Sequence, residues 1–320
     1  MSFEVMAYHL AGNHAGLSSI KDNKNCLDGI IPGLLEAKEN GELVEKSARD
    51  EIERLIGLMG RDLIYPLVQN YGLCSEVSNK LINNQAAISR LHENIVSFLE
   101  KYGFLGFNLN LEGIKHTNKK EFNNLIEILA QNISQKGYQL DISIPAKTEN
   151  NKDHTWSGAY QYDILGMFVD RVMIMAYDYH WPGGPPGPIA PLSWVRDVID
   201  YAIMEMPLEK ICLGIGFYGY DWEVNSDKKA RGLLYSQIEK IRKEKNLEIE
   251  WDQEAQSPYL KYKEGTGEHE IWFENSQSMK KKLQLIREFQ LKGIVFWRPG
   301  QEDPKVWPLV KRFKQSCQGQ

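Results

Sequence analysis

The chain has 320 residues, of which 42% are hydrophobic and 25% are charged, so it can form one large folded domain or two small ones and is not disordered. Its 43 acidic and 38 basic residues are spread evenly and give a formal net charge of -5, which provides no electrostatic footprint for nucleic acid. No apolar run is long enough to span a bilayer, so membrane insertion is not expected.

Strand-like and helix-like segments alternate along the whole chain, which is typical of a parallel sheet with helical crossovers. Eight such units favour a (β/α)8 barrel, or TIM barrel, over a doubly wound sheet. Eight segments are expected to be strands: Phe3–Tyr8, Leu27–Ile31, Asp62–Val68, Phe104–Asn110, Gln139–Ile144, Arg171–Tyr177, Lys210–Phe217 and Gly293–Trp297.

Amphipathic helices are predicted between these strands, with apolar residues at helical spacing over 88–102 and 122–133. Asn118, followed three residues later by Glu121, predicts a capping box at the start of the second of these helices. The densest basic cluster, Lys280–Lys282, is expected on the solvated face of another helix.

The alternation breaks between the seventh and eighth strands. Residues 220–273 hold a helix near 233–244 and three strand-like pieces, and the last two pieces flank a turn at 264–268 as in a hairpin. We therefore expect a small α+β insertion at the rim of a single barrel domain that spans residues 1–320.

The segment 105–112 reads L-G-F-N-L-N-L-E and alternates strictly between apolar and polar residues. Its polar face consists of Asn108, Asn110 and Glu112, at a repeat of about 6.6 Å. Three polar side chains on the inner face of a buried strand carry a large desolvation cost, which favours an active site with Glu112 as its proton donor. The alternative is an antiparallel strand whose polar face lies in water.

Other strands also end in polar or aromatic residues. The carboxyl ends of barrel strands meet at one face, the mouth of the barrel, where active sites lie. Met175 and Tyr177 share one face of the sixth strand, Asp178 follows at its end, and the eighth strand closes with Trp297. A lone aromatic residue at a strand end is more often a core or rim residue. The convergence of these groups with Glu112 favours a site.

A proline-rich loop follows Asp178, with the sequence Y-H-W-P-G-G-P-P-G-P-I-A-P. Each proline ring fixes φ, so little entropy is lost if the loop forms a wall for a ligand. Its aromatic residues, which include Trp181, favour a sugar-binding wall over a rigid but passive connection.

The cysteines and histidines indicate no metal centre, and no cofactor is predicted. The seven histidines show no ligand spacing such as H-E-x-x-H. The four cysteines are far apart and form no C-x-x-C pair: Cys26, Cys74, Cys212 and Cys317.

Several motifs resemble glycoside hydrolase family 18. Residues 106–112 resemble its D-G-x-D-x-D-x-E signature, and M-A-Y-D at 175–178 matches its M-x-Y-D motif. The segments M-A-Y-D-Y-H-W, P-P-G-P-I-A-P, G-I-G-F-Y-G-Y-D-W, S-P-Y-L-K-Y and I-W-F-E are similar to a branch of bacterial spore-germination and cortical-fragment hydrolases. The resemblance covers nearly the whole chain.

The resemblance implies a (β/α)8 barrel that cleaves β-1,4 bonds next to N-acetylglucosamine (GlcNAc) with retention, assisted by the substrate's own acetamido group. Glu112 would protonate the leaving oxygen, Tyr177 would hydrogen-bond the acetamido group, and Asp178 would line the same subsite. Trp297 would floor the sugar ring, and Tyr218 would add a hydroxyl contact. The remaining substrate-binding residues expected are Asn108, Trp181 and Met175.

The resemblance also implies partners and a location. The partners would be GlcNAc-containing polysaccharides or peptidoglycan fragments. The location would be the spore or cell wall of a bacterium, whereas the printed chain shows no signal peptide and by itself indicates no location.

Asn110 departs from the family pattern, in which most active members have Asp; Leu105 also replaces the first acid of the signature. An Asn oxygen can still accept the acetamido N–H, but a neutral hydrogen bond contributes about 0.5 to 1.5 kcal/mol against about 1.5 to 3 for a charged one. A difference of about 1 to 2 kcal/mol in the transition state would slow turnover roughly 5- to 30-fold. Two hypotheses follow: a chitinase-like N-acetylglucosaminidase with reduced activity, and a glycan-binding protein that holds the sugar without cleaving it.

Overall fold

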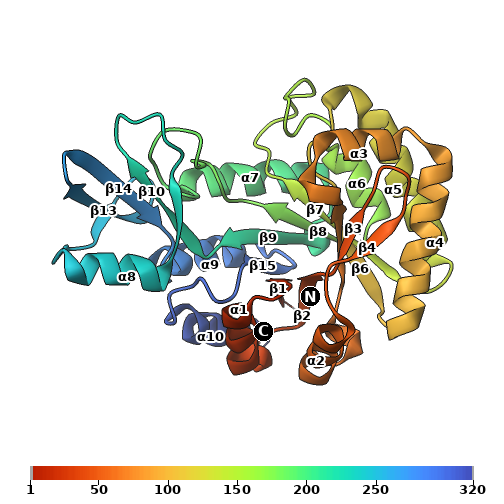
Figure 1. Cartoon of the computed structure of the whole chain (residues 1–320), viewed down its shortest axis with the longest axis horizontal. Coiled ribbons are helices and arrows are strands. Elements are labelled where there is room, and N and C mark those ends of the chain that lie inside the picture. The colour runs from red at the N-terminus through yellow and green to blue at the C-terminus, as the bar shows by residue number, and fades with distance from the viewer. Residues whose placement is uncertain (1–2, 319–320) are drawn as a thin grey trace.

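Strands that follow one another in the sequence lie side by side in one curled sheet, in the computed structural model that describes residues 3–318 (Figure 1). The sheet order is β2-β1-β15-β9-β8-β7-β6-β5-β3-β4, and all of its pairs are parallel except β3 with β4. The strands are β1 Glu4–Leu10, β2 Gly29–Gly33, β3 Leu35–Ala37, β4 Leu43–Glu45, β5 Leu67–Asn70, β6 Gly106–Asn110, β7 Gln139–Pro145, β8 Arg171–Met175, β9 Ile211–Gly216 and β15 Gly293–Trp297.

A bridge between Ile30 and Ile64 joins β2 to the segment before β5, and β3 continues this contact by pairing with β5. The two ends of the sheet thus meet, and the predicted (β/α)8 architecture is confirmed. The terminal residues of the expected 1–320 domain, residues 1–2 and 319–320, lie outside the described part of the chain.

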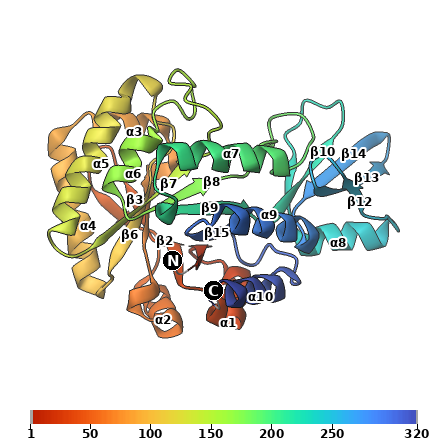
Figure 2. The same ribbon diagram turned by 180° about the vertical axis from the view of Figure 1, so that it is seen from behind.

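Most of the helices cover the outside of this sheet, whereas the helix at 235–244 packs against strands of a second sheet (Figures 1 and 2). Near the two chain ends α1 and α10 lie side by side, and the rings of Phe3 and Phe313 are 5.1 Å apart. The helices are α1 His14–Asn23, α2 Arg49–Met59, α3 Ser75–Ile82, α4 Gln85–Tyr102, α5 Lys119–Ser134, α6 Tyr162–Phe168, α7 Leu192–Glu205, α8 Tyr235–Glu244, α9 Ser276–Phe289 and α10 Val306–Gln318. None of these described helices has the length and apolar character needed to cross a membrane.

The barrel interior is apolar in the middle and polar toward its two ends. Its apolar layer is a buried cluster of Met6, Tyr8, Ile31, Tyr65, Leu67, Met173, Cys212 and Val295. At the N-terminal end of the strands, Arg171 Nε lies 3.0 Å from Asp141 Oδ1 and Arg171 Nη2 lies 2.7 Å from Asp141 Oδ2. Both side chains are buried, so this end is closed by a paired charge.

The third predicted strand, 62–68, is wrong in its extent. Residues Arg61–Leu63 form a 3-10 helix after Gly60, whose φ is +84°, and β5 begins only at Leu67. Pro66 has no N–H, so a regular ladder cannot run through it. The predicted strand therefore reduces to a bridge at Ile64 followed by the short β5.

Two local predictions on helices are also wrong. Asn118 precedes α5, but its side chain makes no cap; its Nδ2 instead donates to Asn79 Oδ1 at 2.8 Å. Lys282 in α9 is only 1% exposed, because its Nζ pairs with the buried Glu274 carboxylate at 2.7 Å. The basic cluster is thus not a solvated face along its whole length.

The chain between the end of β9 and the start of β15 forms a second sheet together with α8. This sheet lies at the end of the molecule opposite α4 (Figure 1). It is antiparallel, and its β13–β14 hairpin matches the turn predicted at 264–268. The sheet extends over 218–273 rather than 220–273, and β10 and β11 were not predicted because Gly219 and Gly232 weaken their strand pattern. Its strands, in the order β11-β10-β14-β13-β12, are β10 Tyr218–Glu223, β11 Arg231–Leu234, β12 Glu250–Asp252, β13 Ser257–Glu264 and β14 Gly267–Phe273.

Candidate active site

Glu112 follows β6 by two residues and lies at the C-terminal mouth of the barrel. Asn110 Nδ2 donates a hydrogen bond to Glu112 Oε1 at 2.8 Å. Burial raises the pKa of Glu112 above its ordinary value; the Asn110 hydrogen bond opposes this rise, and the charge of Asp178 adds to it. A carboxyl group with a raised pKa keeps its proton to higher pH, as a general acid requires.

Only the Nδ2 group of the Asn110 side-chain amide takes part in this contact. The residue is 8% exposed, and among the described residues its Oδ1 has no hydrogen-bond partner. A buried acceptor without a partner carries a desolvation cost of about 1 to 3 kcal/mol. Such an unpaired acceptor beside a carboxylic acid needs an explanation, and a catalytic role is one of those that native structures show.

Asn108 lies on the same inward face but has no exposed surface. Its Oδ1 accepts from Ser143 Oγ at 2.7 Å, and Ser143 Oγ lies 2.5 Å from the hydroxyl of Tyr8. This chain links β1, β6 and β7 beneath the mouth, so Asn108 supports the site from below.

Asp178 begins the loop after β8 with φ of +60°, a left-handed conformation that is uncommon for a residue with a side chain. The hydroxyls of Tyr218 and Tyr220 both donate to its Oδ1, the second at 2.9 Å. Burial raises the pKa of Asp178, and these two hydrogen bonds lower it. Among the residues that the structure describes, this carboxylate has no cationic partner and is held in place by two phenols.

Two glycines in β9 make room for the aromatic side of the site. A Cβ on Gly214 would lie 3.2 Å from the ring of Tyr177, and a Cβ on Gly216 would lie 2.8 Å from the ring of Tyr218. The G-I-G spacing therefore lets both tyrosine rings lie against the strand.

Trp297 ends β15 and completes this aromatic wall. Its ring is 5.3 Å from that of Tyr8, and Tyr177 and Tyr218 belong to the same apolar cluster. Met175 lies at the end of β8, partly exposed, and pairs with Gly214 across the sheet. The structure thus brings most of the predicted site residues to one mouth.

Trp181 lies apart from this group, on the proline-rich loop. The loop is held by hydrogen bonds from Trp222 Nε1 to Gly184 O at 3.1 Å and from Ala230 N to Pro182 O at 2.8 Å. The Trp181 side chain is 55% exposed and lines a depression of about 560 Å³ between this loop and the turn after β10. An exposed indole on a fixed loop is suited to stacking against a sugar ring.

The sequence did not identify Tyr8, Ser143 or Tyr220 as parts of the site. Tyr8 and Ser143 had a signal, because each follows an inward-facing residue at period 2 in a predicted strand. Tyr220 had no periodicity signal, since it lies on β10, which was not predicted as a strand; its one signal is its place in the motif G-I-G-F-Y-G-Y-D-W.

A barrel whose mouth carries a buried carboxylic acid, a second carboxylate and aromatic walls has the architecture of a glycosidase. Residues 77–302 match the model of the protein family described as "Glycosyl hydrolases family 18". The chain therefore belongs to glycosyl hydrolase family 18.

Named relatives and solved structures agree with this assignment. The chain is 31% identical over 252 residues to the cortical fragment-lytic enzyme of Bacillus subtilis, covering 78% of this chain and 58% of that protein. It superposes on the Bacillus cereus spore cortex-lytic enzyme SleL with a TM-score of 0.89 and 26% identity, over 98% of this chain and 74% of the other. For a chitinase from Chromobacterium violaceum the TM-score is 0.90 and the identity 25%, over 98% and 99% of the two chains.

The chain spans 58% of the length of the cortical fragment-lytic enzyme of Bacillus subtilis. It is also 32% identical to a putative sporulation-specific glycosylase from the same organism; that match covers 76% of this chain and 58% of the glycosylase. These relatives therefore contain residues with no counterpart in the aligned part of this chain. What they act on bears on this chain only as a proposal.

Proposed function

We propose that the protein is a retaining, substrate-assisted glycosidase that cleaves β-1,4 bonds in polymers containing GlcNAc. The observation that carries this proposal is the buried Oδ1 of Asn110, which has no partner among the described residues and lies on the amide that already donates to Glu112. Membership of family 18 supports the reaction class.

Asn110 divides its amide between the catalytic acid and the substrate. Its Nδ2 holds Glu112 Oε1, so its Oδ1 is the atom left to accept the acetamido N–H of the reacting sugar. This hydrogen bond would recover the cost of the unpaired acceptor. It would also turn the acetamido oxygen toward the anomeric carbon.

The reaction then follows from the groups at the mouth. Glu112 gives its proton to the glycosidic oxygen as the bond from that oxygen to the anomeric carbon breaks, and the acetamido oxygen forms a bond to the same carbon. The product is a cyclic oxazolinium. Glu112, now a carboxylate, takes a proton from a water molecule that attacks the anomeric carbon and reopens the ring, so the configuration is retained.

The remaining residues bind the sugar in this proposal. Tyr177 contacts the acetamido group, and Asp178 offsets positive charge on the oxazolinium with help from its phenol partners. Trp297 floors the reacting sugar and Trp181 stacks against a more distant one. Asn108 supports Asn110 from below, and the remaining contacts come from Tyr218 and Met175.

The substrate class we propose is spore cortex peptidoglycan fragments, with chitin-like oligomers as the alternative, and the corresponding location is the spore or cell wall. The support is the pair of relatives named as cortex- or cortical fragment-lytic enzymes, together with a similar fold in a chitinase. Both polymers present a 2-acetamido group next to a β-1,4 bond, which is what the mouth would recognise.

A second candidate is a glycan-binding protein that no longer cleaves, and the neutral Asn110 is the observation that favours it. Mass spectrometry of products after incubation with muropeptides and with chitooligosaccharides separates the two. The enzyme gives shorter products that carry a reducing GlcNAc. Intact oligomers that nevertheless bind the protein would establish the second candidate instead.

A further inference from the structure

The hydrogen-bond ladder of the barrel stops before it reaches Glu112. The last pair between β5 and β6 is Gln69 with Asn110, and the last pair between β6 and β7 is Leu109 with Ile142. The main-chain groups of residues 111 and 112 therefore have no strand beside them. Because buried N–H and C=O groups need partners, something other than the sheet must hold this segment.

Three side chains, from β5, from α3 and from the loop before α6, take the place of the missing strands. Asn70 Oδ1, at the end of β5, accepts from Glu112 N at 2.9 Å. Ser78 Oγ, in α3, donates to Glu112 O at 2.8 Å. The hydroxyl of Tyr160 donates to Leu111 O at 2.6 Å. Asn70 and Ser78 have no exposed surface, so water does not compete for these contacts.

The residue after Glu112 is fixed by the same helix. Gly113 has φ of +69°, and a Cβ at this position would lie 2.7 Å from Ser75 Cβ, so the chain must carry a glycine where it passes α3. Asn79 Nδ2 donates to Gly113 O at 2.9 Å, and Asn79 Oδ1 accepts from Lys115 N at 3.0 Å.

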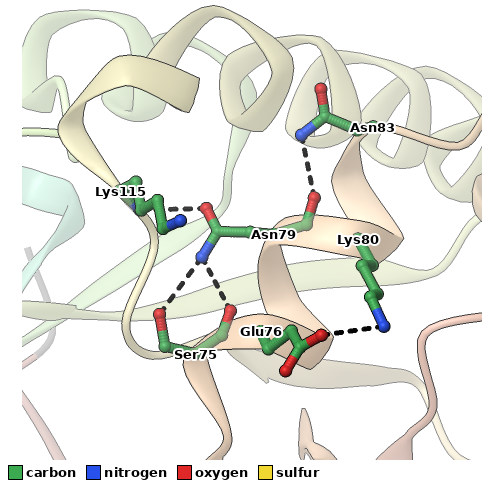
Figure 3. A pocket seen from close by; sticks show the side chains of 6 residues that line it. All are labelled: Ser75, Glu76, Asn79, Lys80, Asn83 and Lys115. Carbon is green, nitrogen blue, oxygen red and sulfur yellow. Dashed lines mark hydrogen bonds and ion pairs between the residues drawn. The ribbon is translucent and has the colours of Figure 1, made fainter.

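Figure 3 shows Asn79 between Ser75 and Lys115, at the edge of an open depression of about 590 Å³. Every polar atom of the Asn79 side chain is used by the protein itself. The depression therefore offers a ligand little beyond surface charges, and the cluster serves the loop that follows Glu112. The lining residues are Ser75, Glu76, Asn79, Lys80, Asn83 and Lys115.

We propose that Asn70 and Ser78 are positioning residues that fix the main chain of Glu112 and so aim its carboxyl group at the glycosidic oxygen. This inference rests on the proposed function of Glu112 as the general acid. Asn70 holds the N–H and Ser78 holds the C=O, so the peptide units on both sides of the Cα are restrained. With its Cα fixed, the side chain reaches Asn110 Nδ2 and presents its other oxygen to the substrate.

The decisive test is Ser78→Ala, which removes one hydroxyl and suits a helix. On a GlcNAc oligomer, kcat should fall about 10- to 100-fold with KM changed less than about threefold, because a small misplacement of a catalytic group has effects of this size. On a 2,4-dinitrophenyl glycoside of the same sugar, kcat should fall less than about threefold, since that leaving group departs without a proton. An equal loss on both substrates, or on neither, would overturn the positioning role.

Asn83→Ala is the matched control. Asn83 lies just beyond the same helix, and its Nδ2 donates to Asn79 O at 2.8 Å without touching the loop of Glu112. It removes one side-chain hydrogen bond to the same helix and should leave kcat on both substrates unchanged. In a Glu112→Gln background, Ser78→Ala should cause no further loss, because there is no acid left to aim.

A second measurement does not depend on turnover. The Glu112 carboxyl can be titrated by 13C NMR in Glu-labelled protein and assigned by its absence in Glu112→Gln. If Ser78→Ala lets the carboxyl leave Asn110, its pKa should rise, because the Asn110 hydrogen bond lowers it. An unchanged titration overturns the positioning role even if the protein proves inactive, whereas a wild type that cleaves neither substrate overturns the proposed function alone.

Discussion

The two ends of the barrel both bury polar side chains, but they satisfy them in opposite ways. At the N-terminal end Asp141 and Arg171 form a bidentate pair, and Glu4 bridges from Arg171 at 3.1 Å to Lys292 at 2.7 Å. At the C-terminal mouth, Glu112 and Asp178 have no cationic partner among the described residues and are held by an amide and two phenols.

This difference separates a stabilising end from a reactive one. Opposite charges at the base leave no unpaired capacity, so the groups there are fixed and chemically silent. Neutral donors at the mouth leave two carboxyl groups without a countercharge among the described residues, together with one unpaired amide oxygen. In a TIM barrel the C-terminal end is where such unpaired capacity is used.

The largest effect should come from removing the acid at the mouth. Glu112→Gln keeps the shape and can still accept from Asn110, but an amide cannot donate the proton. We expect kcat on a GlcNAc oligomer to fall about 100- to 10,000-fold while sugar binding stays within a few-fold. Steady-state kinetics and calorimetric titration on the same oligomer measure the two quantities. Unchanged turnover would refute the assignment of the acid.

At the base the same kind of change should cost stability rather than turnover. Asp141→Asn leaves the buried Arg171 without its bidentate partner, so the free energy of unfolding should fall by about 3 to 5 kcal/mol, measured by urea denaturation. The folded Asp141→Asn protein should retain most of the wild-type kcat. The surface pair Arg196–Glu288 at 2.7 Å is the control, and Glu288→Gln should leave the denaturation midpoint nearly unchanged. A large loss of kcat in folded Asp141→Asn would contradict the view that the N-terminal end serves stability alone.

Asn110→Asp sharpens the comparison by adding a charge to the mouth. A carboxylate orients the acetamido N–H and offsets positive charge in the transition state, so kcat should rise roughly 5- to 30-fold, about 1 to 2 kcal/mol. The pKa of Glu112 should rise further, because a hydrogen bond that lowers it is replaced by a like charge. Glu112 acts protonated, so the alkaline limb of the kcat profile should move to higher pH.

The full pH–rate profiles of both proteins decide the outcome. If Asn110→Asp is slower at every pH, then Asn110 is an adapted catalytic residue of this site rather than a weakened one. If both proteins bind the oligomer and neither cleaves it, the glycan-binding candidate is correct.

The sequence predicted the barrel and several of the side chains that meet at its mouth, because both depend on local periodicity. The period-2 pattern around Asn110 and Glu112 sets which face each side chain takes once the strand forms. The alternation of strand-like and helix-like segments also predicted the place of the insertion, because that alternation stops there. The match to family 18 supports the motifs from which the resemblance was drawn.

What the sequence did not predict depends on partners outside the local hydrophobic pattern. Lys282 is buried because Glu274 meets it across the turn into α9, and charge clustering alone favoured exposure. Asn118 gives its amide to Asn79 instead of capping α5, since the loop after Glu112 passes α3. Tyr220 reaches Asp178 only because β10 pairs with β14 and turns back over the mouth. Such contacts are set by tertiary packing, which no local pattern records.

The smallest effect should come from Tyr220→Phe, which removes one of the two phenols that hold Asp178. Burial already raises the pKa of Asp178 and the hydrogen bond from Tyr220 lowers it, so the variant should have a higher pKa at this residue. The proposed role needs Asp178 ionised. The acid limb of kcat/KM should therefore move to higher pH, while the maximal value falls only about two- to fivefold because Tyr218 still donates.

Tyr259→Phe is the control for this last prediction, since Tyr259 also donates to a carboxylate, Glu250 at 2.8 Å, but in the second sheet away from Asp178. It should leave both limbs of the profile in place. An acid limb that moves to lower pH in Tyr220→Phe would mean that the phenol stabilises the protonated form of Asp178. The mouth would then hold its second carboxyl group as an acid, and the contrast with the paired charges at the base would rest on Glu112 and Asn110 alone.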